Sequence, residues 1–237
     1  LMTVRLAQDI GMDKVAEMAK RVGINDHLPQ YLSSSLGAAS ARVLDMTSAY
    51  GIIVNGGKKV TPYLIERIQD RTGKTIFKQD NYDCLDCNAD RWNGQTAPRR
   101  PDMREQVIDP LTAYQMTSIL EGAVLRGTGA RLRRLNRHLA GKTGTSNDTK
   151  DAWFVGFSPD LVAGVYVGYD EPETLGRYET GAAAALPIFY YFMEEALKDV
   201  PDTNFRIPQG IKLVRINPNT GKPSEPGDAT VITEALK

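Results

Sequence analysis

Three apolar runs decide the fold, because they follow one another closely along the chain. They are HLAGKTGT (138–145), AWFVGF (152–157) and LVAGVYVGY (161–169). Each has the length of a β-strand, and connections as short as theirs join antiparallel neighbours in one sheet. The last two runs are apolar at both alternating sets of positions, so both faces of the sheet need a cover. We therefore expect an α/β fold of the α+β type, with a mostly antiparallel sheet covered by helices on both faces.

The surrounding sequence predicts the covering helices. Apolar residues recur at helical spacing in four segments, 12–22, 39–54, 109–126 and 182–198. Pro110 occupies the favoured first position of the third segment. The fourth segment, with its body IFYYFM, is an evident cover for the sheet.

A hairpin and a long polar stretch interrupt this pattern. The turn sequence DRTGK (70–74) lies between apolar runs at 60–68 and 75–77, which predicts a β-hairpin. The stretch 79–106 is rich in Asp, Asn, Pro and Arg and has no sustained period. We expect it to be a loop insertion, and loops of that length are usually functional or mobile.

The main body is expected over residues 1–200, followed by a tail, 201–237, with one short strand at 211–216. The chain opens with the apolar, helix-like run LMTVRLAQ and has no capping residue ahead of it. We therefore expect an upstream segment in the complete protein. In its absence, Leu1, Val4 and Leu6 would be partly exposed.

Bulk composition excludes several classes. The 237 residues carry a formal net charge of zero, with 41% hydrophobic and 24% charged residues, as in ordinary globular proteins. Nothing in this balance favours a nucleic-acid partner. The arginine-rich stretch 131–137 lacks interleaved aromatics, so a solvated face is the better interpretation. No apolar run approaches the ~20 residues of a membrane span.

The two cysteines, Cys84 and Cys87, form a C-x-x-C pair in the polar stretch. A zinc site would need two more ligands, and the only histidines, His27 and His138, are far apart in sequence. We favour a local disulfide over free thiols, in an oxidising compartment. A metal- or redox-active domain stays an alternative that metal analysis would test, although no metal or cofactor is expected.

The segment Gly141-Lys142-Thr143 suggests a phosphate-binding loop, but the pattern fails. The position of the loop's first glycine holds Asn136, and a helix does not follow the Lys-Thr pair. An exposed edge strand is the better interpretation, because its free backbone groups can pair with an extended peptide. Lys142 and the threonine hydroxyls would then offer donors to a carboxylate, and Gly144 would permit close approach.

In combination, these segments resemble the transpeptidase domain of the class A penicillin-binding proteins, of the 1A type, over nearly the whole chain. The matching runs are KTGT (142–145), DAWFVGF (151–157), VYVGYD (165–170), DPLTAYQM (109–116), RGTG (126–129) and LMTVRLA (1–7). Of the family's three motifs, Ser-x-x-Lys, Ser-x-Asn and Lys-Thr-Gly, only the third occurs in this sequence.

The resemblance implies a D,D-transpeptidase that cross-links peptidoglycan stem peptides through a serine acyl-enzyme. Lys142 would shape the electrostatics around the serine, whose own motif is absent here. Thr143 and Thr145 would bind the substrate's terminal carboxylate, with Gly144 between them, and the Thr145 N–H would supply half of the oxyanion hole. β-Lactam antibiotics would acylate the same serine.

The same resemblance implies partners and a location. The partners would be stem peptides, a lipid-linked precursor and the upstream segment, without nucleic acid. The location would be the periplasmic side of a bacterial inner membrane, in a bifunctional synthase anchored there. The alternative is a non-catalytic peptide-binding module that has kept the groove and lost its nucleophile. Ser-x-x-Lys and Ser-x-Asn in the upstream sequence would decide for the enzyme.

Overall fold

A computed structural model describes residues 1–79, 91, 94, 96 and 102–237 of the chain. It divides into two compact units, which are treated separately below. The first consists of Leu1–Val60 with Gln106–Lys237, and the second is Thr61–Glu105. The cysteines lie outside the described residues, so their pairing stays a prediction.

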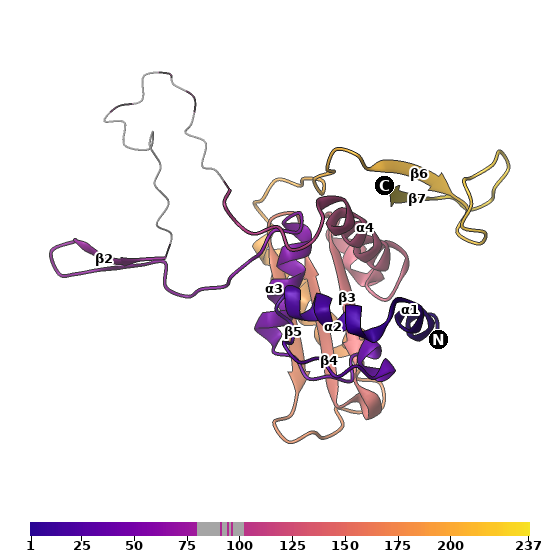
Figure 1. Cartoon of the computed structure of the whole chain (residues 1–237), viewed down its shortest axis with the longest axis horizontal. Coiled ribbons are helices and arrows are strands. Elements are labelled where there is room, and N and C mark those ends of the chain that lie inside the picture. The colour runs from indigo at the N-terminus through magenta and orange to yellow at the C-terminus, as the bar shows by residue number, and fades with distance from the viewer. Residues whose placement is uncertain (80–90, 92–93, 95, 97–101) are drawn as a thin grey trace. The chain divides into compact units, whose positions relative to one another are not determined.

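The first unit is built on a three-stranded antiparallel sheet (Figure 1). Its strands are β3 (Ala140–Thr145), β4 (Asp151–Phe157) and β5 (Val162–Gly168), in the order β3-β4-β5. The register places Lys142 opposite Val155 and Thr143 opposite Phe154. The three adjacent antiparallel strands predicted from the sequence are therefore confirmed.

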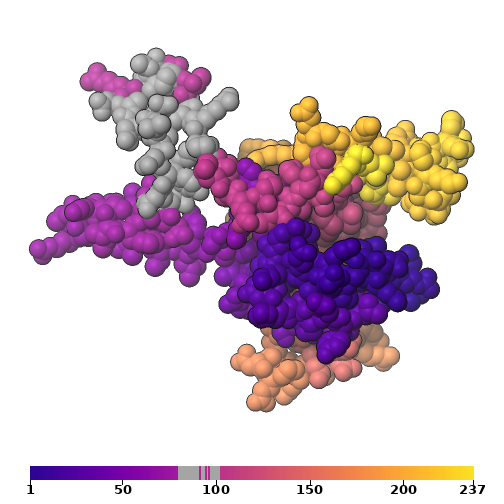
Figure 2. Space-filling model, viewed as in Figure 1, coloured from indigo at the N-terminus to yellow at the C-terminus, as the bar shows by residue number. Residues whose placement is uncertain are grey.

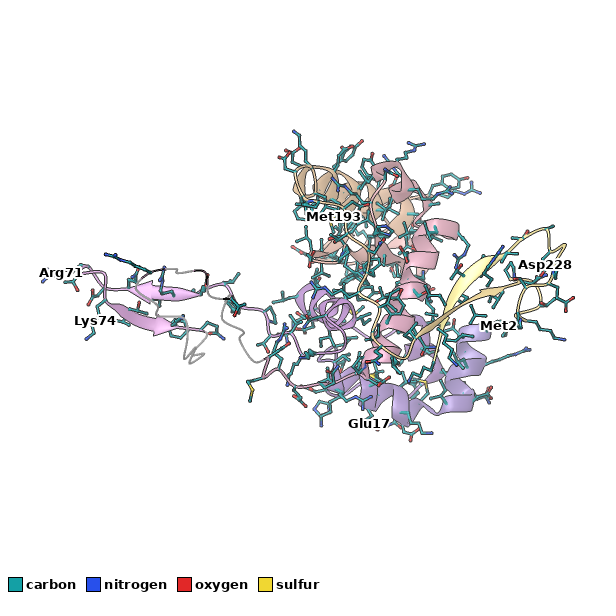
Figure 3. All side chains as sticks on the ribbon, turned by 90° about the horizontal axis from the view of Figure 1, so that it is seen from above. Met2, Glu17, Arg71, Lys74, Met193 and Asp228 are labelled. Carbon is teal, nitrogen blue, oxygen red and sulfur yellow. The ribbon has the colours of Figure 1, made fainter. Side chains whose placement is uncertain are left out.

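Helix α5 (Leu186–Ala196) covers one face of this sheet. The rings of Phe154 and Phe189 lie 4.7 Å apart between centroids, and neither residue is exposed to solvent. Met193, one turn further along α5, lies among the densely packed side chains (Figure 3) and is also fully buried. These contacts belong to the largest apolar cluster of the unit, which packs β4 against α5.

Helices α3 (Val43–Val54) and α4 (Pro110–Arg126) cover the opposite face. Phe157 packs against Tyr50 of α3 at 6.3 Å between ring centroids, and Leu120 of α4 belongs to the same cluster. Gly164 of β5 faces Thr47 so closely that a side chain there would collide with its hydroxyl. Cover on both faces agrees with the expectation from the apolar strands.

The start of α4 shows why this helix begins where the sequence predicts. The Asp109 carboxylate accepts a hydrogen bond from the Thr112 backbone N–H at 3.0 Å, and Pro110 follows in the first turn. The Lys237 ammonium lies 3.0 Å from the same carboxylate. These hydrogen bonds, that of Lys237 foremost, lower the pKa of Asp109 to about 2.

Two further helices, α1 (Met2–Ile10) and α2 (Met12–Arg21), meet at Gly11, whose φ of 96° permits the turn. They spread over the viewed face of the first unit (Figure 2), and α1 contacts the short helix η1 (Leu32–Leu36). Leu1 is 84% exposed and Leu6 is 60% exposed, whereas Val4 is half-buried. The partial exposure expected of this apolar run is thus observed.

Two predicted helix boundaries need correction. The segment expected to be helical from residue 39 enters α3 only at Val43, after Arg42, whose guanidinium pairs with Asp45 at 2.6 Å. The segment expected from 182 to 198 opens with a π-type turn, η4 (Gly181–Ala185), and α5 ends at Ala196. Pro187, near the start of α5, has no N–H to donate to an α-helical turn ahead of it.

Two strand predictions were also incomplete. The strand expected at 60–68 is reduced to β1 (Arg67–Gln69), because Pro62 cannot donate to a ladder. The tail holds two strands and not one: β6 (Lys212–Ile216) pairs antiparallel with β7 (Ile232–Leu236). The second strand was missed because Glu234 and Ala235 are poor strand formers.

The second unit contains the predicted hairpin, with β1 paired to β2 (Thr75–Lys78). Asp70 holds its turn by accepting hydrogen bonds from the Thr72 N–H at 2.8 Å and the Lys74 N–H at 3.0 Å. Hydrogen bonding to Thr72, first of all through its side chain, lowers the pKa of Asp70. Arg71 and Lys74 lie at the tip of this hairpin (Figure 3).

Candidate active site

Strand β3 carries all the predicted site residues: Lys142, expected to act in catalysis, and Thr143, Gly144 and Thr145, expected to bind substrate. Within the described residues it pairs with β4 on one side only, so its other edge is open. Lys142 and Thr145 are exposed, while Thr143 and Gly144 are half-buried. An open edge with this exposure can accept an extended peptide by backbone pairing.

Lys142 folds back along its own strand. Its ammonium donates a hydrogen bond to the Thr143 carbonyl at 3.0 Å and lies 3.5 Å from the Thr143 hydroxyl. It forms no ion pair with a described carboxylate. The positive charge is therefore available to an anionic ligand at the strand.

The Thr143 hydroxyl has a second neighbour, from outside the sheet. The Thr128 hydroxyl lies 2.9 Å away, in the turn that follows α4. The glycines on either side of Thr128 let this turn fold tightly: a side chain at Gly127 would come 2.9 Å from the Ala123 carbonyl oxygen. The contact of this Arg-Gly-Thr-Gly run with β3 was not predicted from the sequence.

The Thr145 hydroxyl is held from another direction. It accepts a hydrogen bond from the Gly181 N–H at 3.0 Å, at the first residue of η4. Gly181 lies so close to the strands that a side chain there would meet the carbonyl oxygens of Gly144 and Trp153. This contact was not predicted from the sequence, because 36 residues separate its partners.

The loop beyond Thr145 is fixed to a second loop. Within η3 (Asn147–Thr149), Asp148 and Thr149 both have positive φ, 59° and 51°. The Thr149 hydroxyl donates to the Gly176 carbonyl at 2.7 Å, and the Leu175 N–H donates to the Thr149 carbonyl at 2.9 Å. These bonds stabilise an unfavourable backbone conformation just beyond the end of β3.

An aromatic pair lies beside the same end of the sheet. The rings of Trp153 and Tyr166 are 5.0 Å apart, and the Tyr166 hydroxyl donates to Asp151 at 2.8 Å. That hydrogen bond raises the pKa of Tyr166. Tyr166 is 39% exposed, so part of this aromatic surface is open to solvent.

The arginine-rich stretch divides into two kinds of residue. Arg131, Arg133 and Arg134, on η2 (Ala130–Leu135), are exposed around an open hollow of about 460 Å³. Arg137 instead donates to the carbonyls of Leu197 and Val200, both at 2.8 Å, beyond the end of α5. The three arginines of η2 therefore form the solvated face that the sequence predicts. Arg137 instead connects the segment just before β3 to the segment after α5.

A more enclosed cavity of about 150 Å³ lies at the opposite end of β3. Its lining includes His138, Ser158, Leu161 and Asp202. It is therefore separate from Lys142–Thr145.

The remaining features concern the cysteine pair, metal ions and membrane spans. Cys84 and Cys87, with most of the 79–106 stretch, lie outside the described residues. Among the residues that are described, no cluster of His, Cys, Asp or Glu could hold a metal ion. The helices in that part of the chain are also too short, or not apolar enough, to cross a bilayer.

Comparison with known proteins gives one consistent result. Residues 1–194 match the family model described as penicillin binding protein transpeptidase domain. Penicillin-binding protein 1A of Rickettsia conorii is 46% identical over 241 residues, and that of Pseudomonas aeruginosa is 37% identical over 268. Both alignments cover the whole of this chain but only 30% and 33% of the relatives, so the chain spans about a third of their length.

Solved structures agree with this match. The crystal structure of penicillin-binding protein 1A from Haemophilus influenzae superposes with a TM-score of 0.83 at 33% identity, covering 98% of this chain and 38% of that one. The PonA1 protein from Mycobacterium tuberculosis, solved in complex with penicillin V, shares the fold at a TM-score of 0.60 and 24% identity. The superposition with PonA1 covers 79% of this chain and 50% of the PonA1 chain.

Proposed function

Since the chain belongs to the penicillin-binding protein transpeptidase domain family, we propose that it forms the substrate-strand part of a peptidoglycan D,D-transpeptidase. The observation that carries the proposal is the open edge of β3, where a lysine and two threonine hydroxyls lie beside unpaired backbone. The nucleophilic serine would come from chain outside these 237 residues, because Ser-x-x-Lys occurs nowhere among them.

The proposed reaction is an acyl transfer in two steps. The serine hydroxyl attacks the carbonyl of the penultimate D-alanine, the peptide bond breaks, and terminal D-alanine leaves with a proton. An amine of a second stem peptide then attacks the acyl-enzyme ester, and the serine is released. β-Lactams would replace the peptide in the first step and leave the serine acylated.

Each of the four residues from Lys142 to Thr145 has a proposed role. Lys142 favours negative charge near the serine proton relay, and Thr143 and Thr145 bind the terminal carboxylate of the peptide. The Thr145 N–H would supply half of the oxyanion hole, and loss of one such donor typically costs about 10²–10³ in rate. Gly144 leaves room for the substrate backbone.

The proposal also covers the setting of the enzyme. Its partners would be stem peptides, lipid-linked precursor and the upstream segment of the same protein. We place the domain on the periplasmic side of an inner-membrane-anchored bifunctional synthase that also carries glycosyltransferase activity. No nucleic acid or cofactor is required.

Lys142→Ala in the full-length protein tests the role of the strand. We expect acylation by labelled penicillin to slow by at least about tenfold, the cost of one charge-assisted contact. Lys212→Ala is the matched control, since Lys212 is an exposed lysine on a strand of another sheet, and it should acylate at the normal rate. Near-normal acylation of a folded Lys142→Ala variant would contradict the proposal.

A non-catalytic peptide-binding module remains the rival. The full-length wild-type protein distinguishes the two: an enzyme becomes covalently labelled by penicillin, whereas a module without a nucleophile does not. Residues 1–237 alone should take up no covalent label in either case. Covalent labelling of that piece would mean that a nucleophile lies within it, which would overturn our assignment of the serine.

A further inference from the structure

Both threonine hydroxyls of β3 are held by groups that lie outside the sheet. Thr128, after α4, contacts the Thr143 hydroxyl at 2.9 Å. The Gly181 N–H, at the start of η4, donates to the Thr145 hydroxyl at 3.0 Å. Thr128 precedes β3 in the sequence and Gly181 follows it. Their partners, Thr143 and Thr145, are nevertheless only two residues apart on the strand.

The chemistry of a hydroxyl makes the second contact directional. A hydroxyl has one proton to donate and two lone pairs that accept. The Gly181 N–H can only donate, so it occupies a lone pair of the Thr145 oxygen. The hydroxyl proton of Thr145 is thereby left for another acceptor, and no described residue provides one.

The first contact permits the same arrangement. The Lys142 ammonium, 3.5 Å away, can only donate toward the Thr143 oxygen. When Thr128 also donates to that oxygen, both lone pairs are occupied and the Thr143 proton is free. Because Thr143 and Thr145 are two residues apart on a strand, their side chains share a side of it.

The support behind each contact is rigid. The Gly127 N–H donates to the Ala123 carbonyl at 3.1 Å, which fixes the Thr128 turn to the last turn of α4. Gly181 leads through η4 directly into α5, whose Leu186 and Phe189 are buried in the core. Helix packing therefore places the Gly181 N–H directly, and it places the backbone that carries the Thr128 side chain.

We propose that Thr128 and Gly181 are positioning residues, which orient the Thr143 and Thr145 hydroxyls to donate to the carboxylate of an anionic ligand. The proposal rests on the proposed function, in which that carboxylate is the terminal group of the stem peptide. Neither residue touches the substrate; each acts through the threonine that it contacts.

The test uses the full-length protein and two probes, a labelled penicillin with its free carboxylate and the neutral methyl ester of the same compound. Thr128→Val should slow acylation by the carboxylate probe about tenfold, the effect of weakening one hydrogen bond to a charged group. The ester should change less than about twofold. Thr128→Ser, which keeps the hydroxyl, should restore the carboxylate rate.

Three outcomes are decisive. Equal slowing of both probes by Thr128→Val would show a structural role only and overturn the proposal. An unchanged carboxylate rate in the folded variant would overturn it too, while leaving the proposed function intact. A wild-type protein that neither probe acylates would overturn the proposed function and this inference together.

A double-mutant cycle tests the route through Thr143. If Thr128 acts only through that hydroxyl, Thr128→Val should add nothing to the effect of Thr143→Val on the carboxylate probe. Fully additive effects would contradict the positioning role.

Gly181→Ala tests the second contact, since its methyl group would push η4 away from Gly144 and Trp153. We expect selective loss with the carboxylate probe, and Ala182→Ser, at the exposed next position, should behave as wild type. If Gly181→Ala does not fold, the Thr128 variants and their double-mutant cycle still test the proposal. Equal loss with both probes in folded Gly181→Ala would refute the role of this contact.

Discussion

Asp109 shows how a single carboxylate connects the end of the tail to a helix. It accepts hydrogen bonds from the Thr112 backbone and hydroxyl and lies 3.0 Å from the Lys237 ammonium. These contacts place its folded-state pKa at about 2, below its ordinary value of 3.8. Because the pKa of this carboxyl group is lower in the folded state than in the unfolded state, its charge stabilises the folded state when the pH is above the unfolded-state pKa. This stabilisation is lost as the pH falls toward the folded-state pKa.

Asp109→Asn should therefore show a pH-dependent defect. Asparagine can still cap α4, so the variant loses mainly the charge. We expect its melting temperature to lie a few degrees below wild type near neutral pH and to converge with it near pH 2, as measured by circular dichroism. Asp9→Asn, at an exposed position of α1, should follow wild type throughout. A difference that stays constant with pH would refute this origin.

At the same scale, the sequence predicted the residues of β3 but not their neighbours. Lys142 to Thr145 could be named because they lie together in a short motif on one strand. Thr128 and Gly181 contact that strand across 15 and 36 residues of chain. No local pattern encodes such contacts, because helix packing decides which backbone meets the strand.

Among the elements, α5 contributes to the largest apolar cluster packed against the sheet. Phe189 is fully buried against Phe154, whereas Tyr191, two residues on, is 61% exposed. Phe189→Ala should lower the free energy of unfolding by about 3–5 kcal/mol, the usual cost of emptying a buried aromatic site. Tyr191→Ala should cost at most about 1 kcal/mol. Chemical denaturation of the two variants measures both, and similar losses would mean that α5 is misplaced on the sheet.

The elements also show where sequence information ends. The strands of the main sheet were predictable because they are apolar on both faces, and α4 because Asp109 and Pro110 mark its start. Strand β7 carries no such signal. Its place depends on contacts with α4, in which Arg126 pairs with Glu234 at 3.2 Å and Gln115 donates to the Ala235 carbonyl at 3.0 Å.

At the scale of the whole molecule, an apolar stripe on α1 is exposed to solvent. Met2, Leu6 and Ile10 recur every four residues and are 73%, 60% and 43% exposed; Met2 lies at the surface of α1 in Figure 3. Burial of each such side chain is worth about 1.5–3 kcal/mol. A stripe of this kind favours association with another apolar surface.

Residues 1–237 expressed alone should therefore self-associate or be unstable, and the upstream segment should restore stability when added. Light scattering after size exclusion would measure association. Leu6→Gln combined with Ile10→Gln should reduce it, and Leu213→Gln, at an exposed position of β6, should not. A monomeric, stable wild-type piece would contradict the expectation.

The tie between β7 and α4 has a consequence for the order in which the chain folds. Its hydrogen bonds, Arg126 to Glu234 and Gln115 to Ala235, join partners that are 108 and 120 positions apart in the sequence. The strands β3, β4 and β5 are instead joined by short loops. Closing a longer loop costs more chain entropy, and contacts between distant residues form slowly. The meander can thus form early, and the β6–β7 hairpin joins it late. The same hairpin is the segment that can detach first in a partial opening, while the strand that carries Lys142 stays paired.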